Sequence, residues 1–158
     1  MFAFFKKRRE IQDARTKIGI DLHRQVREAL KQDESGATKR LSSSFTVGYI
    51  YAFVRDSFFS LGVDPTDNLD SQIKQICDGV IPGKLHRIYS DQKAALALAR
   101  EMKNQDDEIL NSGLSPALIT KLFTLGARSG SYDAPLVSIE CTPPDNLRRF
   151  LVNESLRS

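Results

Sequence analysis

The chain has 158 residues, of which 41% are hydrophobic and 27% charged, and its formal net charge is +3. That length suffices for one domain that buries about two-thirds of its unfolded surface. The composition is that of an ordinary globular protein rather than a disordered or fibrous one. The two cysteines, Cys77 and Cys141, lie far apart and without companion ligands, so neither a disulfide framework nor a zinc site is predicted. We expect one helical domain over residues 1–158 that needs no cofactor.

The positive charge is concentrated at the N-terminus. Residues 1–40 contain 11 Lys or Arg against 6 Asp or Glu, a net +5, which leaves 12 against 14, a net −2, in residues 41–158. The longest apolar run, residues 45–54, is about half of the ~20 residues needed to cross a bilayer. Aromatic residues precede the first basic run, the reverse of a secretory signal. We therefore expect a cytoplasmic protein, with peripheral membrane association as an alternative.

The first predicted helix is basic and amphipathic and covers residues 1–31, with its clearest pattern from residue 8 onward. Its apolar residues recur at steps of seven, four, four and three, which places them on one narrow stripe: Ile11, Ile18, Leu22, Val26 and Ala29. Residues 32–44 follow, with Gly36 and three consecutive serines. This composition predicts a linker between the first helix and a helical core over residues 45–130.

Residues 45–61 form the most apolar predicted helix, with apolar side chains almost all round. Such a helix belongs in the centre of a bundle. Gly62 is expected to end it, and Asp64 and Pro65 to begin a shorter helix. The apolar residues of that helix step by three and four: Leu69, Ile73, Ile76, Cys77 and Val80.

Three further segments complete the predicted fold. Ser90 or Asp91 can cap a long helix through residue 109, and Ser115 and Pro116 begin another that we expect to end at Gly126 or Gly130. Residues 131–158 are predicted as an extended segment, with strand-like composition at 136–141, followed by a short helix that docks through Leu147, Phe150 and Leu151. The predicted class is all-α: a compact bundle of about five to six helices with a short extended segment near the C-terminus.

The N-terminal aromatic-basic block is the first candidate binding surface. Three aromatic residues are followed directly by four cations: Phe2, Phe4, Phe5, Lys6, Lys7, Arg8 and Arg9. Rings can lie among lipid headgroups while each cation gains about 1 kcal/mol from anionic lipid. Alternatively, the rings cover the protein's own core or that of a partner chain. Both an anionic membrane and a protein partner, including a second copy, remain open.

Nucleic acid is a weaker alternative partner. Six cations of the first predicted helix lie opposite its apolar stripe: Lys6, Arg9, Lys17, Arg24, Arg27 and Lys31. Acidic residues accompany them, however, and the spacings of Asp13 with Lys17 and of Arg24 with Glu28 suit salt bridges. No nucleic-acid recognition motif accompanies the charge, so we expect a solvated, ion-paired helix surface.

The aromatic helix at residues 45–61 supplies a second candidate surface. Its aromatic side chains include Tyr49, Tyr51, Phe53 and Phe58. Core packing is the ordinary use of aromatic residues at helical spacing, and an apolar interface or pocket is the alternative.

No residue pattern identifies a catalytic reaction. His23 and His86 have no neighbouring His or Cys, and the acidic residues around Asp64 lack the calcium-binding loop pattern. Residues 126–130 lack the ending of a phosphate-binding loop. Our first hypothesis is a non-catalytic helical interaction or adaptor protein. The alternative is an enzyme whose site gathers dispersed residues such as His23, His86, Asp91 and Arg128.

Overall fold

The computed structural model describes residues 1–65, 69–80, 87, 89–90, 93, 116–139 and 142–158, which contain six α-helices, one 3-10 helix and no strand. The predicted all-α class is confirmed. In chain order the elements are α1 (Phe2–Gln32), α2 (Glu34–Leu41), α3 (Ser44–Ser60), α4 (Leu69–Val80), α6 (Pro116–Asp133), η1 (Ala134–Ser138) and α7 (Asn146–Leu151). Apart from Ser90 and Lys93, the long helix expected between residues 90 and 109 lies outside the described residues.

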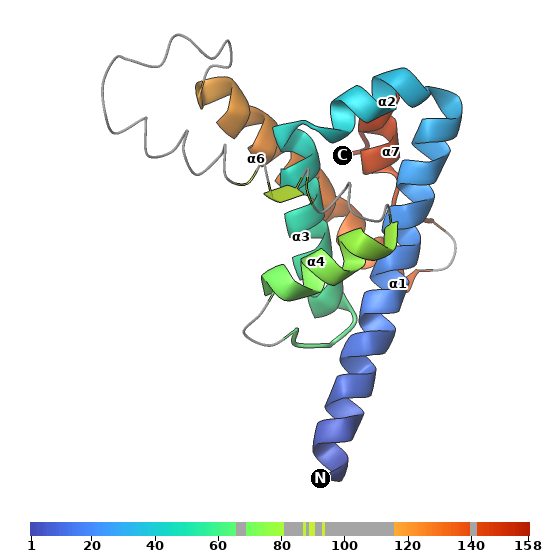
Figure 1. Cartoon of the computed structure of the whole chain (residues 1–158), viewed down its shortest axis with the longest axis vertical. Coiled ribbons are helices and arrows are strands. Elements are labelled where there is room, and N and C mark those ends of the chain that lie inside the picture. The colour runs from blue at the N-terminus through green and yellow to red at the C-terminus, as the bar shows by residue number, and fades with distance from the viewer. Residues whose placement is uncertain (66–68, 81–86, 88, 91–92, 94–115, 140–141) are drawn as a thin grey trace.

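The bundle is organised around α3. Helix α6 crosses behind α3 and makes the largest helix–helix contact with it, while α1 runs along the side and also contacts α4 and α7 (Figure 1). Helix α2 joins α1 to α3 at one end, and the short α7 packs beneath it (Figure 1). The N-terminal turns of α1 extend well beyond all the other described elements (Figure 1).

Helix α3 is central because apolar side chains surround it. The rings of Phe45, Tyr49 and Phe53 stack along one face, with centroids 6.4 and 5.3 Å apart, and Phe150 of α7 stacks on Phe45 at 3.8 Å. Gly62, with φ of +69°, ends the helix as predicted. Its N–H bonds to the Phe59 carbonyl, the arrangement for which a left-handed glycine is favoured.

Three glycines allow α3 and α6 to approach until their backbones touch. A Cβ at Gly48 would lie 2.1 Å from the Phe123 carbonyl oxygen, and one at Gly126 would lie 2.1 Å from the Phe45 carbonyl oxygen. A Cβ at Gly130 would lie 2.5 Å from the Tyr49 carbonyl oxygen. The expectation that α6 ends at Gly126 or Gly130 was therefore wrong. The helix continues to Asp133, and its glycines serve close packing rather than termination.

The linker expected at residues 32–44 is largely a helix. The Asp33 carboxylate accepts the Gly36 N–H at 2.9 Å and so caps the start of α2. Ala37 and Leu41, one turn apart, are buried. Local capping and a short apolar stripe thus outweigh the glycine and serine content that suggested a linker.

The C-terminal region also differs in part from the prediction. Leu136 and Val137 lie in the 3-10 helix η1 rather than in an extended segment, and the backbone becomes extended only at Ile139. Helix α7 forms as predicted, with Leu147 and Leu151 fully buried. It ends at a left-handed Asn153, φ 62°, where the Glu154 N–H bonds to the Arg149 carbonyl.

Candidate binding surface

Residues 1–10, which we call the projecting end, carry large apolar side chains that the fold leaves in solvent. Phe2 is 93% exposed, Phe4 61% and Phe5 60%. Burial along α1 begins at Ile11, which is half-buried, and becomes complete at Ala14 and Ile18. The three phenylalanines therefore do not cover the protein's own core, which was one of the alternatives for this block.

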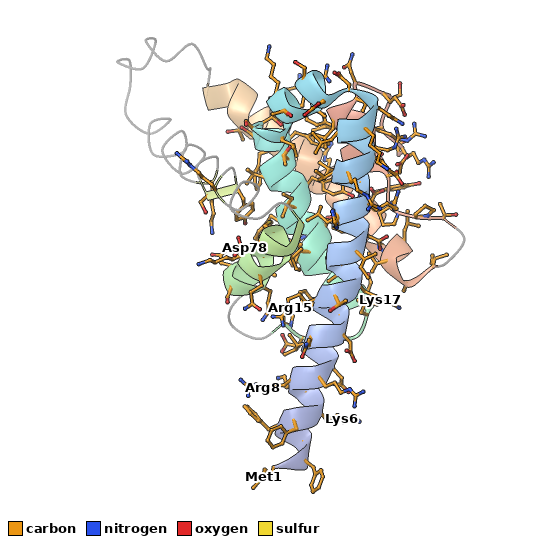
Figure 2. All side chains as sticks on the ribbon, turned by 45° about the vertical axis from the view of Figure 1, so that its right-hand side comes forward. Met1, Lys6, Arg8, Arg15, Lys17 and Asp78 are labelled. Atoms are coloured by element: carbon orange, nitrogen blue, oxygen red, sulfur yellow. The ribbon has the colours of Figure 1, made fainter. Side chains whose placement is uncertain are left out.

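The four cations of the projecting end spread around the helix. Lys6 approaches Glu10 on its own helix at 4.0 Å, while the Arg8 guanidinium lies over the Phe4 ring, 5.2 Å from its centroid. Met1, Lys6 and Arg8 stand clear of the body in Figure 2. Within the part of the chain that the structure describes, Lys7, Arg8 and Arg9 form no ion pair with a carboxylate. Their charge is available to an external anion.

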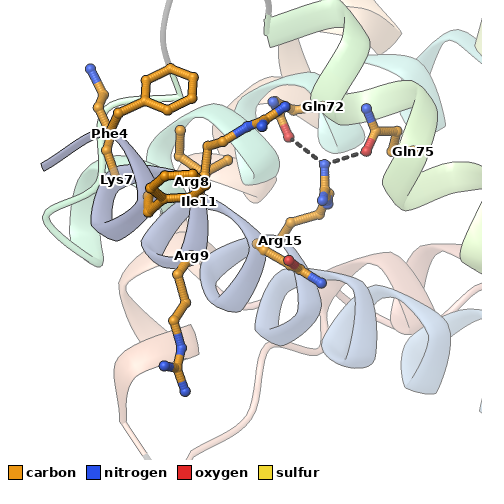
Figure 3. A pocket seen from close by; sticks show the side chains of 10 residues that line it. Phe4, Lys7, Arg8, Arg9, Ile11, Arg15, Gln72 and Gln75 are labelled. Atoms are coloured by element: carbon orange, nitrogen blue, oxygen red, sulfur yellow. Dashed lines mark hydrogen bonds between the residues drawn. The ribbon is translucent and has the colours of Figure 1, made fainter. Parts of the chain in front are cut away.

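On one side, the projecting end faces α4 across a groove with a volume of about 830 Å³. Arg15 marks the inner end of the groove, where it donates to Gln72 at 3.1 Å and also to Gln75 (Figure 3). The groove is lined by ten residues: Phe4, Phe5, Lys7, Arg8, Arg9, Ile11, Gln12, Arg15, Gln72 and Gln75. It contains four cations and no carboxylate, so an anionic occupant is favoured electrostatically.

A buried polar cluster among the described residues joins four elements. Tyr49 donates to Asp133 at 2.7 Å and receives a hydrogen bond from the Gln25 amide at 3.0 Å. Asp133 also accepts from the backbone of Asp145 and from both nitrogens of Asn146, while Gln25 accepts from the Leu147 N–H. Tyr49, Gln25, Asp133 and Asn146 are wholly buried. The cluster ties α7 to the bundle and offers no open surface to a substrate.

Burial dominates the electrostatics of this cluster. It raises the pKa of Asp133, against the hydrogen bonds from Asn146, Tyr49 and Asp145, which lower it. It also raises the pKa of Tyr49 well above its ordinary value, helped by the neighbouring Asp133 charge. Tyr49 therefore stays protonated as a donor. Sequence reasoning missed this cluster because its members are dispersed along the chain.

A second cluster fixes the C-terminal segment. Arg148 forms a bidentate pair with Asp145 at 2.6 and 2.9 Å and a second with Glu154, at 2.9 and 3.2 Å. Arg149 also reaches Asp145 at 2.9 Å. Burial alone would raise the pKa of Asp145, but hydrogen bonds and charge from Arg148 and Arg149 outweigh it and lower the pKa. These cations are engaged within the fold, unlike those of the projecting end.

The candidate aromatic surface is mostly interior. Tyr49, Phe53 and Phe58 have no exposed area, so they pack the core and offer no surface to a partner. Tyr51 is half-buried, with the Arg55 guanidinium 5.4 Å from its ring centroid.

The residues considered for a dispersed active site are not brought together by any described contact. His23 and Arg128 are exposed, whereas His86 and Asp91 lie outside the described residues. Cys77 is buried, and burial raises the pKa of its thiol to about 12, so it is not a reactive thiolate at neutral pH. Arg24 pairs with Glu28 at 3.1 Å, as its spacing predicted, which reduces the charge available to nucleic acid.

Two general features bound the chemistry of the described residues. None of their His, Cys, Asp or Glu side chains gather in groups of three or more that could hold a metal ion. No helix among these residues has both the length and the apolar content to cross a membrane. Comparison with protein-family models, curated proteins and solved structures gives no match.

Proposed function

We propose that this chain is a non-catalytic interaction protein that docks on an anionic macromolecular surface through its projecting end. The observation that carries the proposal is the exposure of Phe2, Phe4 and Phe5, which are 60 to 93% accessible beside four consecutive cations. A soluble fold rarely leaves several large apolar side chains together in solvent without a use for them.

The energetics favour an anionic surface that also accepts apolar side chains. Fully burying one phenylalanine contributes roughly 1.5–3 kcal/mol. A cation near an anionic bilayer contributes about 1 kcal/mol, so four cations would contribute about 4 kcal/mol before the costs of association. Together the rings and cations of one short helix end are sufficient for a specific, reversible contact.

Several cations elsewhere on the described surface are already engaged in ion pairs. The Arg148 and Arg149 cations are paired with Asp145 and Glu154. Lys93 pairs with Asp70 at 2.7 Å. Another exposed ring, Phe59, is 86% accessible, but it lies beside Arg55 and Asp56, which pair with each other. At the projecting end, by contrast, three exposed rings adjoin three cations, Lys7, Arg8 and Arg9, that pair with no carboxylate among the described residues.

The proposal is tested by binding of two anionic probes, polyglutamate and vesicles of phosphatidylcholine with phosphatidylserine. The full chain is compared with a variant lacking residues 1–9 and with a Phe2, Phe4, Phe5→Ser triple variant. Phe59→Ser is the matched control, because it removes an equally exposed ring elsewhere. We expect binding of at least one probe to the full chain and to the control, and its loss in both N-terminal variants. Equal binding by the deletion variant, or no binding by the full chain, would refute the proposal.

A further inference from the structure

We propose that the groove between the projecting end and α4 receives an acidic amphipathic helix from a partner protein. This inference rests on the proposed function and names the partner's chemistry. The observation that carries it is that the groove brings two apolar side chains, Phe4 and Ile11, which we call its floor, together with the cations Lys7, Arg8 and Arg15 and the amides Gln72 and Gln75 (Figure 3).

The floor of the groove continues the buried stripe of α1. Phe4, Ile11, Ile18 and Leu22 lie within about 40° of one another around the helix, at about 100° per residue. Ile18 and Leu22 are covered by the bundle, whereas Ile11 is half-buried and Phe4 is 61% exposed. The same apolar face thus runs out of the body and loses its cover where the groove begins.

The spacing of the floor suits a helix. Phe4 and Ile11 are seven residues apart, a separation of about 10.5 Å along α1. On a partner helix, apolar residues at positions i, i+3 or i+4, and i+7 cover the same length. A second helix laid beside α1 would therefore extend the helical packing already present between α1 and α4.

The positive charge of the groove favours a partner helix with negatively charged side chains. Among the described residues the lining of the groove includes four cations, three of which (Lys7, Arg8 and Arg15) adjoin the floor, and no carboxylate. The Arg8 side chain extends toward Gln72 and Arg15, while Arg9 points to the other side of α1 (Figure 3). Glutamates flanking the apolar stripe of a partner helix would meet Lys7 and Arg8 on one side and Arg15 at the inner end.

Charge and shape argue against the other occupants. The α1 helix of a second copy would bring the same four cations against this groove and be repelled. A bilayer surface is flat over the length of the groove. It would therefore contact Phe2 and Phe5 at the tip of α1 rather than enter the groove between the two helices. The groove therefore fits a ridge-shaped, acidic polypeptide best.

The test is fluorescence anisotropy with a labelled synthetic helix that has leucines along one face and glutamates elsewhere. The comparison peptide has the same composition with the leucines dispersed around the helix. The full chain is compared with Arg8→Glu, which reverses a charge inside the groove, and with Phe4→Ser, which removes its floor. Lys6→Glu is the matched control: it makes the same charge change two residues away, and Lys6 does not line the groove.

We expect the full chain to bind the one-faced peptide about tenfold more tightly than the dispersed peptide. Arg8→Glu and Phe4→Ser should each weaken that binding about tenfold, because each removes a contact at the centre of the interface. Lys6→Glu should change it by less than about threefold, the effect of an exposed rim charge. Circular dichroism of each variant verifies that α1 is still formed.

Two results would overturn the groove while leaving the proposed function in place. In one, Arg8→Glu and Lys6→Glu weaken binding equally, which indicates diffuse attraction to the whole projecting end. In the other, phosphatidylserine vesicles bind with dependence on residues 1–9 but neither peptide does, which assigns the projecting end to a membrane surface. If no probe binds, or if binding survives deletion of residues 1–9, both proposals fail.

Discussion

Replacing Gly126 by alanine would push α3 and α6 apart. The new Cβ would lie 2.1 Å from the Phe45 carbonyl oxygen and 2.9 Å from the Tyr49 nitrogen. Both are backbone atoms of a buried helix, so neither can move aside without moving all of α3. The interface then has to open along its length, and the buried contacts at Gly48 and Gly130 loosen with it.

The expected loss can be worked from two opposing terms. Alanine is favoured over glycine inside a helix by about 0.5–1 kcal/mol. Overpacking a core costs about 1–3 kcal/mol, and a contact between two backbones belongs at the upper end of that range. The net change is therefore about 2 kcal/mol less stability. For a domain of this size that corresponds to a fall of about 4–8 °C in melting temperature.

The assay is urea unfolding followed by far-UV circular dichroism, with Gly19→Ala as the control. Gly19 lies inside α1, and a Cβ there would meet nothing within 4 Å. Gly19→Ala should raise stability by about 0.5–1 kcal/mol, through helix propensity alone. If Gly126→Ala were as stable as the parent chain, the close approach of α3 and α6 would be refuted.

Three other substitutions test the interior and the helix ends. Tyr49→Phe removes the hydroxyl that donates to Asp133 at 2.7 Å. It should lower the free energy of unfolding in urea by about 1–3 kcal/mol, because buried polar partners are left without a hydrogen bond. A change under about 0.5 kcal/mol would contradict this. Asp145 has a lowered folded-state pKa, so the stability it contributes is complete above about pH 4 and is lost as pH falls through the folded pKa. Thermal unfolding should accordingly show the advantage of the parent over Asp145→Asn shrinking on acidification, and an advantage that grows would contradict the assignment. Gly62→Ala places a Cβ on a residue with φ of +69° and should lower the free energy of unfolding by about 1–2 kcal/mol. An unchanged free energy of unfolding would argue against a left-handed conformation at this residue.

Helices that bury a continuous stripe or a whole surface could be predicted from the sequence. The steps between Ile18, Leu22 and Val26 in α1 and the all-round apolar character of α3 are local patterns, and the structure buries those residues. Helix α7 was predicted for a similar reason, since Leu147 and Leu151 are one turn apart behind a proline pair. In each case the spacing of the apolar residues predicts a helix, and the nearby glycine or proline residues predict where that helix begins or ends.

Glycine was the main source of error, because its sequence context does not reveal which role it has. Gly62 ends a helix in a left-handed turn, whereas Gly126 lies inside one and makes room for another backbone. The four-residue spacing of Gly126 and Gly130, which puts both on one face of a helix, was the available signal for close packing. Its partner, Gly48, lies 78 positions away from Gly126 in the chain, so no local pattern connects them.

The candidate surface was predicted in composition but not in geometry. The sequence places Phe4 and Arg8 in one block, yet whether these side chains are buried depends on where α4 packs along α1. The groove could not be inferred, because Gln72 and Gln75 are amides without a recognisable pattern. The Gln25, Tyr49 and Asp133 cluster has the same limitation, since its partners are brought together only by the tertiary fold.

The helical state of the projecting end is itself coupled to what it binds. Nucleating a helix is costly, but adding turns to an existing helix is nearly neutral per residue, so the buried part of α1 from Ala14 onward supports the turns before it. Those turns gain no burial of Phe2 or Phe5 that would hold them against fraying. A partner helix in the groove would supply that burial. Hydrogen exchange of the amides in residues 5–12 should therefore slow when the one-faced peptide is added, while the amides around Leu22 should be unaffected. Slowing at both places would indicate a change of the whole bundle rather than docking on the projecting end.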